Sequence, residues 1–165
     1  MTIPVERETE LKLGFDEESL IRQVVFAALD AEKCPYEAEV DVLLTDDEAI
    51  REINRAERGI DQATDVLSFP ALELPAPGDF SRVEEDPMLF HPESGELLLG
   101  DMVISLDKVR QQAAEYGHGE ARELAFLTAH SMYHLMGWDH EEEEERIEME
   151  ARQESLLQRL GITRD

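Results

Sequence analysis

The sequence has a single cysteine, Cys34, among its 165 residues. One cysteine excludes an internal disulfide and provides no cluster of thiolates for a metal ion. Long hydrophobic runs are also lacking: the longest, such as Val24–Leu29, fall far short of the roughly twenty apolar residues that span a bilayer. Residues 1–5 do not have the basic and then apolar layout of a secretory signal. We therefore expect a cytoplasmic protein with no membrane partner.

Basic side chains are scarce, because 15 Lys and Arg stand against 40 Asp and Glu, for a formal net charge of −25. A field of this sign repels nucleic acid and anionic membranes, so binding to either needs a local basic patch. For most of the surface we take the acidic excess to serve solubility. Hydrophobic residues still make up 42% of the chain, which is enough for a buried core. The length suits one domain over residues 1–165.

The hydrophobic pattern predicts an alternation of strands and helices. Strands are expected at residues 3–15, 40–44, 65–69 and 97–105. Further helices are expected at residues 107–116, 120–136 and 142–160. A first helix is capped by Asp16 and ends before Pro35. A second begins at a capping box formed by Thr45 and Glu48 and ends near Gly59.

The pattern is lost between residues 70 and 96, where five of the seven prolines fall between Pro70 and Pro92 among several acidic residues. We expect a long, mobile, acidic loop in this segment. There is no internal repeat and no sign of a second domain. The order of strands and helices indicates a compact α+β or mixed α/β unit.

Three of the five histidines fall within eleven residues, at positions 130, 134 and 140. Residues four apart share one side of a helix, about 6 Å apart along its axis, so His130 and His134 can converge on one ion. Gly137 can end this helix and turn the chain back, because glycine readily adopts a left-handed conformation. His140 then supplies a third nitrogen, which leaves one tetrahedral position for water as in catalytic zinc sites. We predict one zinc-like ion bound by these three residues.

The spacing also matches the metzincin pattern of metalloproteases, except that Ser131 stands where those enzymes carry the glutamate that acts as general base. A serine hydroxyl cannot take a proton from metal-bound water near neutral pH without its own base, which counts against a protease. A zinc hydrolase acting on a peptide or small molecule remains an alternative. His91 and His118 have no comparable neighbours, and we expect ordinary structural roles for them.

Three blocks of sequence are similar to those of a known family. They are Ile-Asn-Arg-Ala-Glu-Arg-Gly-Ile-Asp at 53–61, running on to Thr-Asp-Val-Leu-Ser-Phe-Pro at 64–70, then Leu-Gly-Asp-Met-Val-Ile-Ser at 99–105, and the histidine segment 130–140. With these blocks in this order, the chain resembles the YbeY endoribonucleases, also called rRNA maturation factors, over nearly its whole length.

The resemblance implies an α+β fold with a mixed four-stranded sheet, about five helices and a zincin-like metal helix. It also implies one Zn²⁺ ion bound by His130, His134 and His140. The implied activity is cleavage of single-stranded RNA in the maturation of ribosomal RNA, notably the 3′ end of the small-subunit RNA, with a part in ribosome quality control. Precursor rRNA and the small ribosomal subunit are the implied partners. The functionally important arginine of the family corresponds to Arg58.

The spacing of three arginines, four and then three residues apart, places Arg51, Arg55 and Arg58 on one helical face. A guanidinium fork matches two phosphate oxygens, so Arg58 is the candidate catalytic residue opposite the ion. For Arg51 and Arg55 we favour a solvated face paired with Glu48 and Glu52.

Asp139 stands beside a predicted ligand, and three roles remain open for it. It could orient that ligand, act as the missing base, or cap the final helix. We expect Glu141 to Glu145 to form a solvated helix start, where negative charge suits the helix dipole. A second alternative function is a noncatalytic ribosome-assembly factor whose zinc is structural, with Asp139 or another acidic side chain closing the site.

Overall fold

The computed structural model describes residues 1–139 and 141–162, and these form a four-stranded mixed sheet with five α-helices. The strands are β1 (Val5–Arg7), β2 (Ala38–Thr45), β3 (Val66–Pro70) and β4 (Leu97–Ser105). The helices are α1 (Glu17–Ala31), α2 (Asp47–Arg58), α3 (Leu106–Tyr116), α4 (Glu120–Leu135) and α5 (Glu143–Arg159). The predicted α+β fold with a mixed sheet is confirmed. In this described part no helix is long and apolar enough to cross a membrane.

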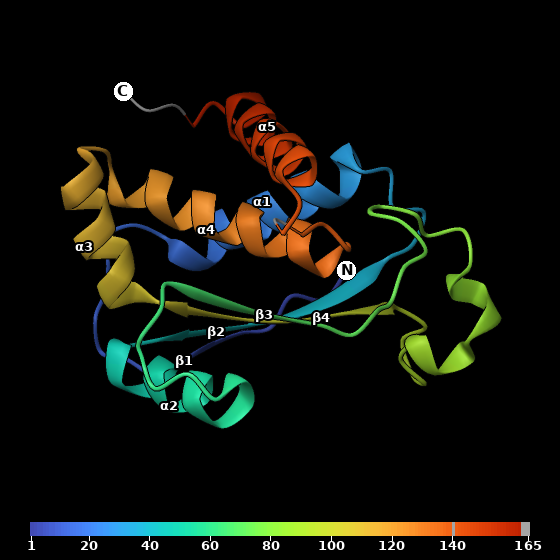
Figure 1. Ribbon diagram of the computed structural model, residues 1–165. Helices are drawn as coiled ribbons and strands as arrows, with labels where there is room; N and C mark the ends of the chain where they lie inside the picture. Colours follow the sequence, from blue (N-terminus) through green and yellow to red (C-terminus); the bar gives the residue numbers. More distant parts are fainter. Residues whose placement is uncertain (140, 163–165) are drawn as a thin grey trace.

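The sheet has the strand order β1-β2-β4-β3, with β1, β2 and β4 parallel and β3 antiparallel at the edge. Helices α1, α4 and α5 lie on one side of it and α2 on the other (Figure 1). The main core lies between the sheet and α1 and α4, because alternate residues of β2 and one face of α1 are apolar and buried. A smaller cluster of Ile50, Leu67 and Val103 lies between α2 and the other face of the sheet.

The predicted cap of α1 is confirmed, since the Asp16 carboxylate accepts a hydrogen bond from the Ser19 amide at 3.0 Å. Gly59 ends α2 in the left-handed conformation, with φ of 71°. The predicted capping box at the start of α2 is wrong. Asp46 is the cap there, whereas Thr45 is the buried last residue of β2. The strand runs one residue further than expected because it pairs with β4 up to Ser105.

The predicted first strand is too long, because β1 spans only Val5–Arg7, although Thr2 also forms an isolated bridge with Glu39 of β2. After β1 the chain turns, and Arg7 donates hydrogen bonds to the Leu11 carbonyl and to the Glu17 carboxylate. Leu11, Leu13 and Phe15 pack against the core without pairing in the sheet. Their alternation therefore reflects contact with the core and not a strand.

The acidic segment from 70 to 96 is irregular, as predicted, apart from the end of β3 and two short 3₁₀ helices, Val83–Glu85 and Pro87–Leu89. Leu72, Phe80 and Val83 are nevertheless buried in the main core. The Gly78 amide donates to the Met136 carbonyl at 2.9 Å, so this loop packs against the end of α4. Its mobility stays a prediction.

A local irregularity in β4 goes with a close approach of β3 to β4. Glu39 pairs with Leu98 but Val40 pairs with Gly100, so one residue of β4 is skipped. Gly100 has a φ of 144°, and a Cβ atom there would lie 2.4 Å from the Phe69 carbonyl oxygen. Only glycine fits this position, because any side chain would push β3 away from β4.

The strand pair β2 and β4 places two carboxylates side by side, Asp41 and Asp101. Burial, and then the charge of Asp41, raises the pKa of Asp101. Replacing Asp101 by Asn should therefore raise the free energy of unfolding at pH 7, by about 0.2–1 kcal/mol for one like-charge pair on adjacent strands.

The sign of the pH dependence follows from the raised pKa. The native state loses stability as the pH rises from the unfolded-state pKa, near 4, through the higher native pKa, so the gain from Asp101→Asn should shrink as the pH falls toward 4. Urea unfolding of the wild type and of Asp101→Asn between pH 4 and pH 8 measures this difference in the free energy of unfolding. Glu93→Gln, which removes one exposed charge from the loop, is the control. An equal gain in both variants would show that net charge, and not the Asp41–Asp101 pair, is responsible.

Candidate metal centre and pocket

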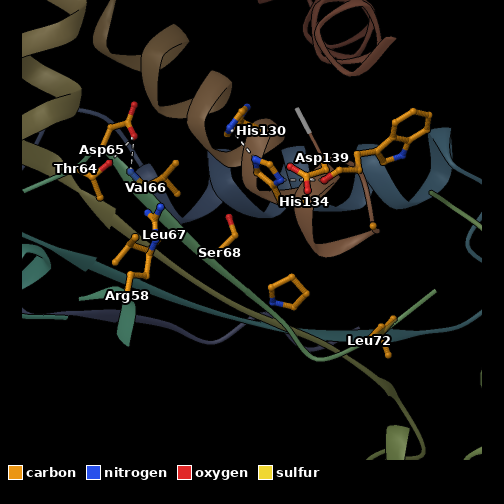
Figure 2. Close-up of a pocket in the computed structure, with 13 residues that line it drawn as sticks. Arg58, Thr64, Asp65, Val66, Leu67, Ser68, Leu72, His130, His134 and Asp139 are labelled. Atoms are coloured by element: carbon orange, nitrogen blue, oxygen red, sulfur yellow. Dashed lines mark hydrogen bonds between the residues drawn. The ribbon is translucent and has the colours of Figure 1, made fainter. Parts of the chain in front are cut away.

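A pocket of about 570 Å³ opens between the end of α4 and β3 (Figure 2). Its walls come from α2, from β3 and the segment before it, from α4 and from the turn after α4. The lining residues are Arg58, Thr64, Asp65, Val66, Leu67, Ser68, Pro70, Leu72, His130, His134, Gly137, Trp138 and Asp139.

Two histidines face one another in this pocket, as the sequence predicts. The Nε2 atoms of His130 and His134 are 3.1 Å apart, and their rings are nearly perpendicular at 85° (Figure 2). At a tetrahedral zinc ion with Zn–N bonds of about 2 Å, two ligand nitrogens lie roughly 3.3 Å apart. The spacing and the nitrogen donors of this pair therefore fit a shared metal ion.

The turn after α4 fixes the orientation of His134. Gly137 has a φ of 97°, and its amide donates to the His134 carbonyl while the Trp138 amide donates to the Tyr133 carbonyl. These two bonds form a Schellman motif, so the predicted break at glycine is confirmed. The motif places the Trp138 carbonyl 2.9 Å from Nδ1 of His134. Because a carbonyl only accepts, Nδ1 carries the proton and the Nε2 lone pair faces His130.

His130 is oriented by a residue that the sequence patterns did not reveal. Its Nδ1 lies 2.7 Å from the Gln153 side-chain nitrogen, on α5. Its ring also stacks on Phe126, with ring centres 6.4 Å apart and planes 17° apart. A glutamine 23 positions away in an acidic helix carries no spacing signal, so only the packing of α5 on α4 identifies it.

The predicted third ligand, His140, lies outside the described residues, and its part in a metal site stays a prediction. Within residues 1–139 and 141–162, no three His, Cys, Asp or Glu side chains gather in a group that could hold a metal ion.

Asp139 lines the pocket, and its amide donates to the Glu145 carboxylate at 2.7 Å. Its suggested role as a helix cap is wrong, because the cap of α5 is Glu142. Orienting a ligand and acting as base stay open for Asp139.

Arg58 is the last residue of α2 and lines the same pocket, across from the two histidines (Figure 2). The helix ends there because Gly59 turns the chain. Among the described residues, no carboxylate lies within ion-pair distance of its guanidinium, which is therefore available to an anion that enters the pocket.

The other two arginines of this helical face form ion pairs with carboxylates. Arg55 pairs with Glu52 at 2.6 Å, as predicted, but Arg51 pairs with Asp61 and not with Glu48. The hydrogen bonds between Arg51 and Asp61 raise the pKa of the arginine and lower that of the carboxyl group. Among the three arginines of this face, Arg58 is thus the one without an ion pair to a described residue.

Ser131, next to His130 in the sequence, is not among the residues that line the pocket. It is fully buried, and its hydroxyl shares a 2.7 Å hydrogen bond with the Ser68 hydroxyl on β3. This bond joins α4 to the strand that forms the pocket wall.

The remaining histidines have the structural roles expected of them. Nδ1 of His91 accepts two amides of its own turn, and His118 contacts the buried Glu123.

The fold and the pocket define a small α+β protein with a paired-histidine candidate metal centre. A family model described as Endoribonuclease YbeY matches residues 5–161. The chain belongs to this family.

Individual relatives agree with this assignment. The protein named Endoribonuclease YbeY of Lachnoclostridium phytofermentans is 57% identical over 165 residues, covering 99% of this chain and 100% of the relative. The protein of the same name from Lachnospira eligens is 54% identical, with the same coverage. The fold is also similar to the solution structure of TM1509 from Thermotoga maritima, with a TM-score of 0.57 and 23% identity over 97% of this chain and 92% of that one.

The contact between Ser131 and Ser68 leads to a test of the serine's role. Ser131→Ala should lower the free energy of unfolding by about 1 kcal/mol, because one buried hydrogen bond is lost. Cleavage of RNA should stay near the wild-type rate, because Ser131 does not line the pocket and its hydroxyl is bonded to Ser68. Urea unfolding and a cleavage assay measure the two effects. A large loss of cleavage with unchanged stability would show instead that the hydroxyl takes part in the reaction.

Proposed function

We propose that this protein is a zinc-dependent endoribonuclease that cleaves single-stranded RNA in the cytoplasm. Its substrate is precursor ribosomal RNA on the small subunit, notably near the 3′ end of the small-subunit RNA, and it takes part in ribosome quality control. The observation that carries the proposal is the pair of imidazole Nε2 atoms, 3.1 Å apart, in a pocket that also exposes Arg58. Membership of the Endoribonuclease YbeY family supports the same reaction.

The metal ion would be held by His130 and His134, together with His140. A bound zinc ion supplies a Lewis acid for a phosphoryl oxygen or lowers the pKa of a water molecule. The two described histidines contribute neutral nitrogen donors, and His134 has its Nδ1 proton fixed by the Trp138 carbonyl. Imidazole ligands also suit nickel, copper and iron, so zinc itself has to be measured in the purified protein.

Arg58 binds the phosphate in this proposal. Its fork donates two parallel hydrogen bonds to phosphate oxygens and stabilises the negative charge that builds up during cleavage. Local recognition of this kind is needed because the net charge of −25 repels RNA at long range. A phosphate has to enter the pocket to reach both Arg58 and the histidines. An unstacked single strand meets that requirement more easily than a duplex.

The metal centre is tested by His134→Ala. The variant should lose bound zinc and lose at least about 100-fold in cleavage, because two neutral nitrogens no longer meet at one point. Zinc content is measured by mass spectrometry of the purified protein and cleavage with a single-stranded precursor of small-subunit rRNA. His91→Ala, in the loop, should match the wild type in both.

Two other results from the wild type would each overturn the proposal. Cleavage of peptides without cleavage of RNA would identify a zinc hydrolase of another substrate class. Retention of zinc with neither activity would identify a structural zinc site in a noncatalytic assembly factor.

The role of Arg58 has its own test. Arg58→Ala should reduce cleavage by about 10²–10³-fold, the usual effect of removing one group that stabilises developing charge. Zinc content should not change, because the guanidinium is not a ligand. Arg55→Ala, which removes a cation already paired with Glu52 on the same helix, should cleave nearly as well as the wild type. Unaltered cleavage by Arg58→Ala would remove Arg58 from the mechanism.

A further inference from the structure

Gln153 is a buried amide in a helix whose other buried residues are apolar. Its side chain is 1% exposed, whereas Met149, Leu156 and Leu157 form the rest of the buried face of α5. Burying an amide is costly unless it is hydrogen-bonded. This amide lies 2.7 Å from Nδ1 of His130. Gln153 therefore makes a polar contact with a predicted metal ligand at a position where the rest of the buried helix face is apolar.

An imidazole that gives Nε2 to a metal ion must carry its proton on Nδ1, and it needs an acceptor there. For His134 the acceptor is the Trp138 carbonyl, which can accept a hydrogen bond but cannot donate one. The group facing Nδ1 of His130 is an amide, and an amide has both a donor nitrogen and an acceptor oxygen. The two histidines of the pair are thus oriented by groups of different kinds.

In the structure the Gln153 nitrogen faces His130, which makes one directional chain of hydrogen bonds. Gln153 donates to Nδ1 of His130, Nε2 of His130 donates to Nε2 of His134, and Nδ1 of His134 donates to the Trp138 carbonyl. This chain is self-consistent but unsuited to metal binding. The proton of His130 occupies its Nε2, and the lone pair of His134 accepts it.

A half-turn of the amide reverses the first link. The Gln153 oxygen then accepts from Nδ1 of His130, so that ring gives up its Nε2 proton to water and takes one at Nδ1, and both Nε2 lone pairs can be given to an ion. The ring stays neutral, and no other reactant is needed. The two orientations of one buried side chain therefore correspond to a closed and an open form of the histidine pair.

We propose that Gln153 is a positioning residue that selects the metal-binding tautomer of His130 by turning its amide when the ion binds. The proposal rests on the proposed function, because it concerns the same metal ion. It assigns to α5 a direct effect on metal affinity, through a side chain that touches neither the ion nor the RNA.

The test compares two replacements of Gln153 in the full chain. Gln153→Met keeps the length but removes the acceptor, and should weaken zinc binding about 10–100-fold. Gln153→Glu keeps only acceptor oxygens, and should bind zinc at least as tightly as the wild type. Zinc affinity is measured at pH 8 by competition with a chromogenic chelator. Gln158→Met, an exposed glutamine on the same helix, should leave the affinity unchanged.

Nitrogen-15 NMR of the histidine rings provides a second readout that packing alone would not change. In the metal-free wild type the His130 proton should be on Nε2, and on zinc binding it should move to Nδ1. In metal-free Gln153→Glu it should already be on Nδ1. Thermal unfolding of the metal-free variants checks that each is folded.

The outcomes separate the two proposals. Equal loss of zinc affinity in Gln153→Met and Gln153→Glu, or no loss in Gln153→Met, would overturn the role of Gln153 while leaving the metal centre intact. If the wild type binds no zinc, the proposed function fails, and the role of Gln153 in metal loading fails with it. Wild-type binding with a loss only in Gln153→Met supports both.

Discussion

The packing of α4 is the constraint on which the rest of the site depends. Eleven of its sixteen residues are buried, because the helix packs on the sheet beside α1 and is covered by α5 on the side away from the sheet (Figure 1). A helix enclosed in this way cannot rotate about its axis without moving the core. The direction in which His130 and His134 point is therefore decided by the apolar residues of the helix, such as Met132 and Leu135, and not by the histidines themselves. The close approach of β3 to β4 at Gly100 then sets how far the opposite wall of the pocket stands from them.

Hydrogen bonds supply the finer positioning that packing leaves open. The turn at Gly137 presents a carbonyl to one imidazole, and α5 presents a buried amide to the other. Both partners act on Nδ1, so both rings aim Nε2 at the same point. The hydroxyl pair Ser68 and Ser131 joins the helix to the pocket wall at a position where metzincins carry a catalytic glutamate. Histidines at the same helical spacing can therefore have different neighbouring side chains, a serine here and a glutamate in metzincins.

Charge in this protein is organised locally, against a strongly acidic background. Most arginines on the surface are neutralised by neighbouring carboxylates, as Arg51 is by Asp61 and Arg55 by Glu52. Arg58 differs because it stands at the end of its helix, beyond the reach of these partners in the described chain, and faces the pocket. One available guanidinium beside a candidate metal centre concentrates positive charge where a phosphate is proposed to bind.

Features that depend on near neighbours in the chain can be predicted from the sequence alone. The cap at Asp16, the ends of helices at Gly59 and Gly137, and the pairing of His130 with His134 are all of this kind, because each follows from spacing within a few residues. Where a residue is held by a contact with a distant strand or with the core, the prediction from its neighbours in the chain is wrong. The pattern at Thr45 predicts a cap, but the residue pairs with a distant strand in the sheet. The alternation at residues 11–15 predicts a strand, but contact with the core has the same period. The contacts of Gln153 with His130 and of Ser131 with Ser68 become visible only in the folded protein, because they depend on how whole elements pack and leave no periodic signal in the chain.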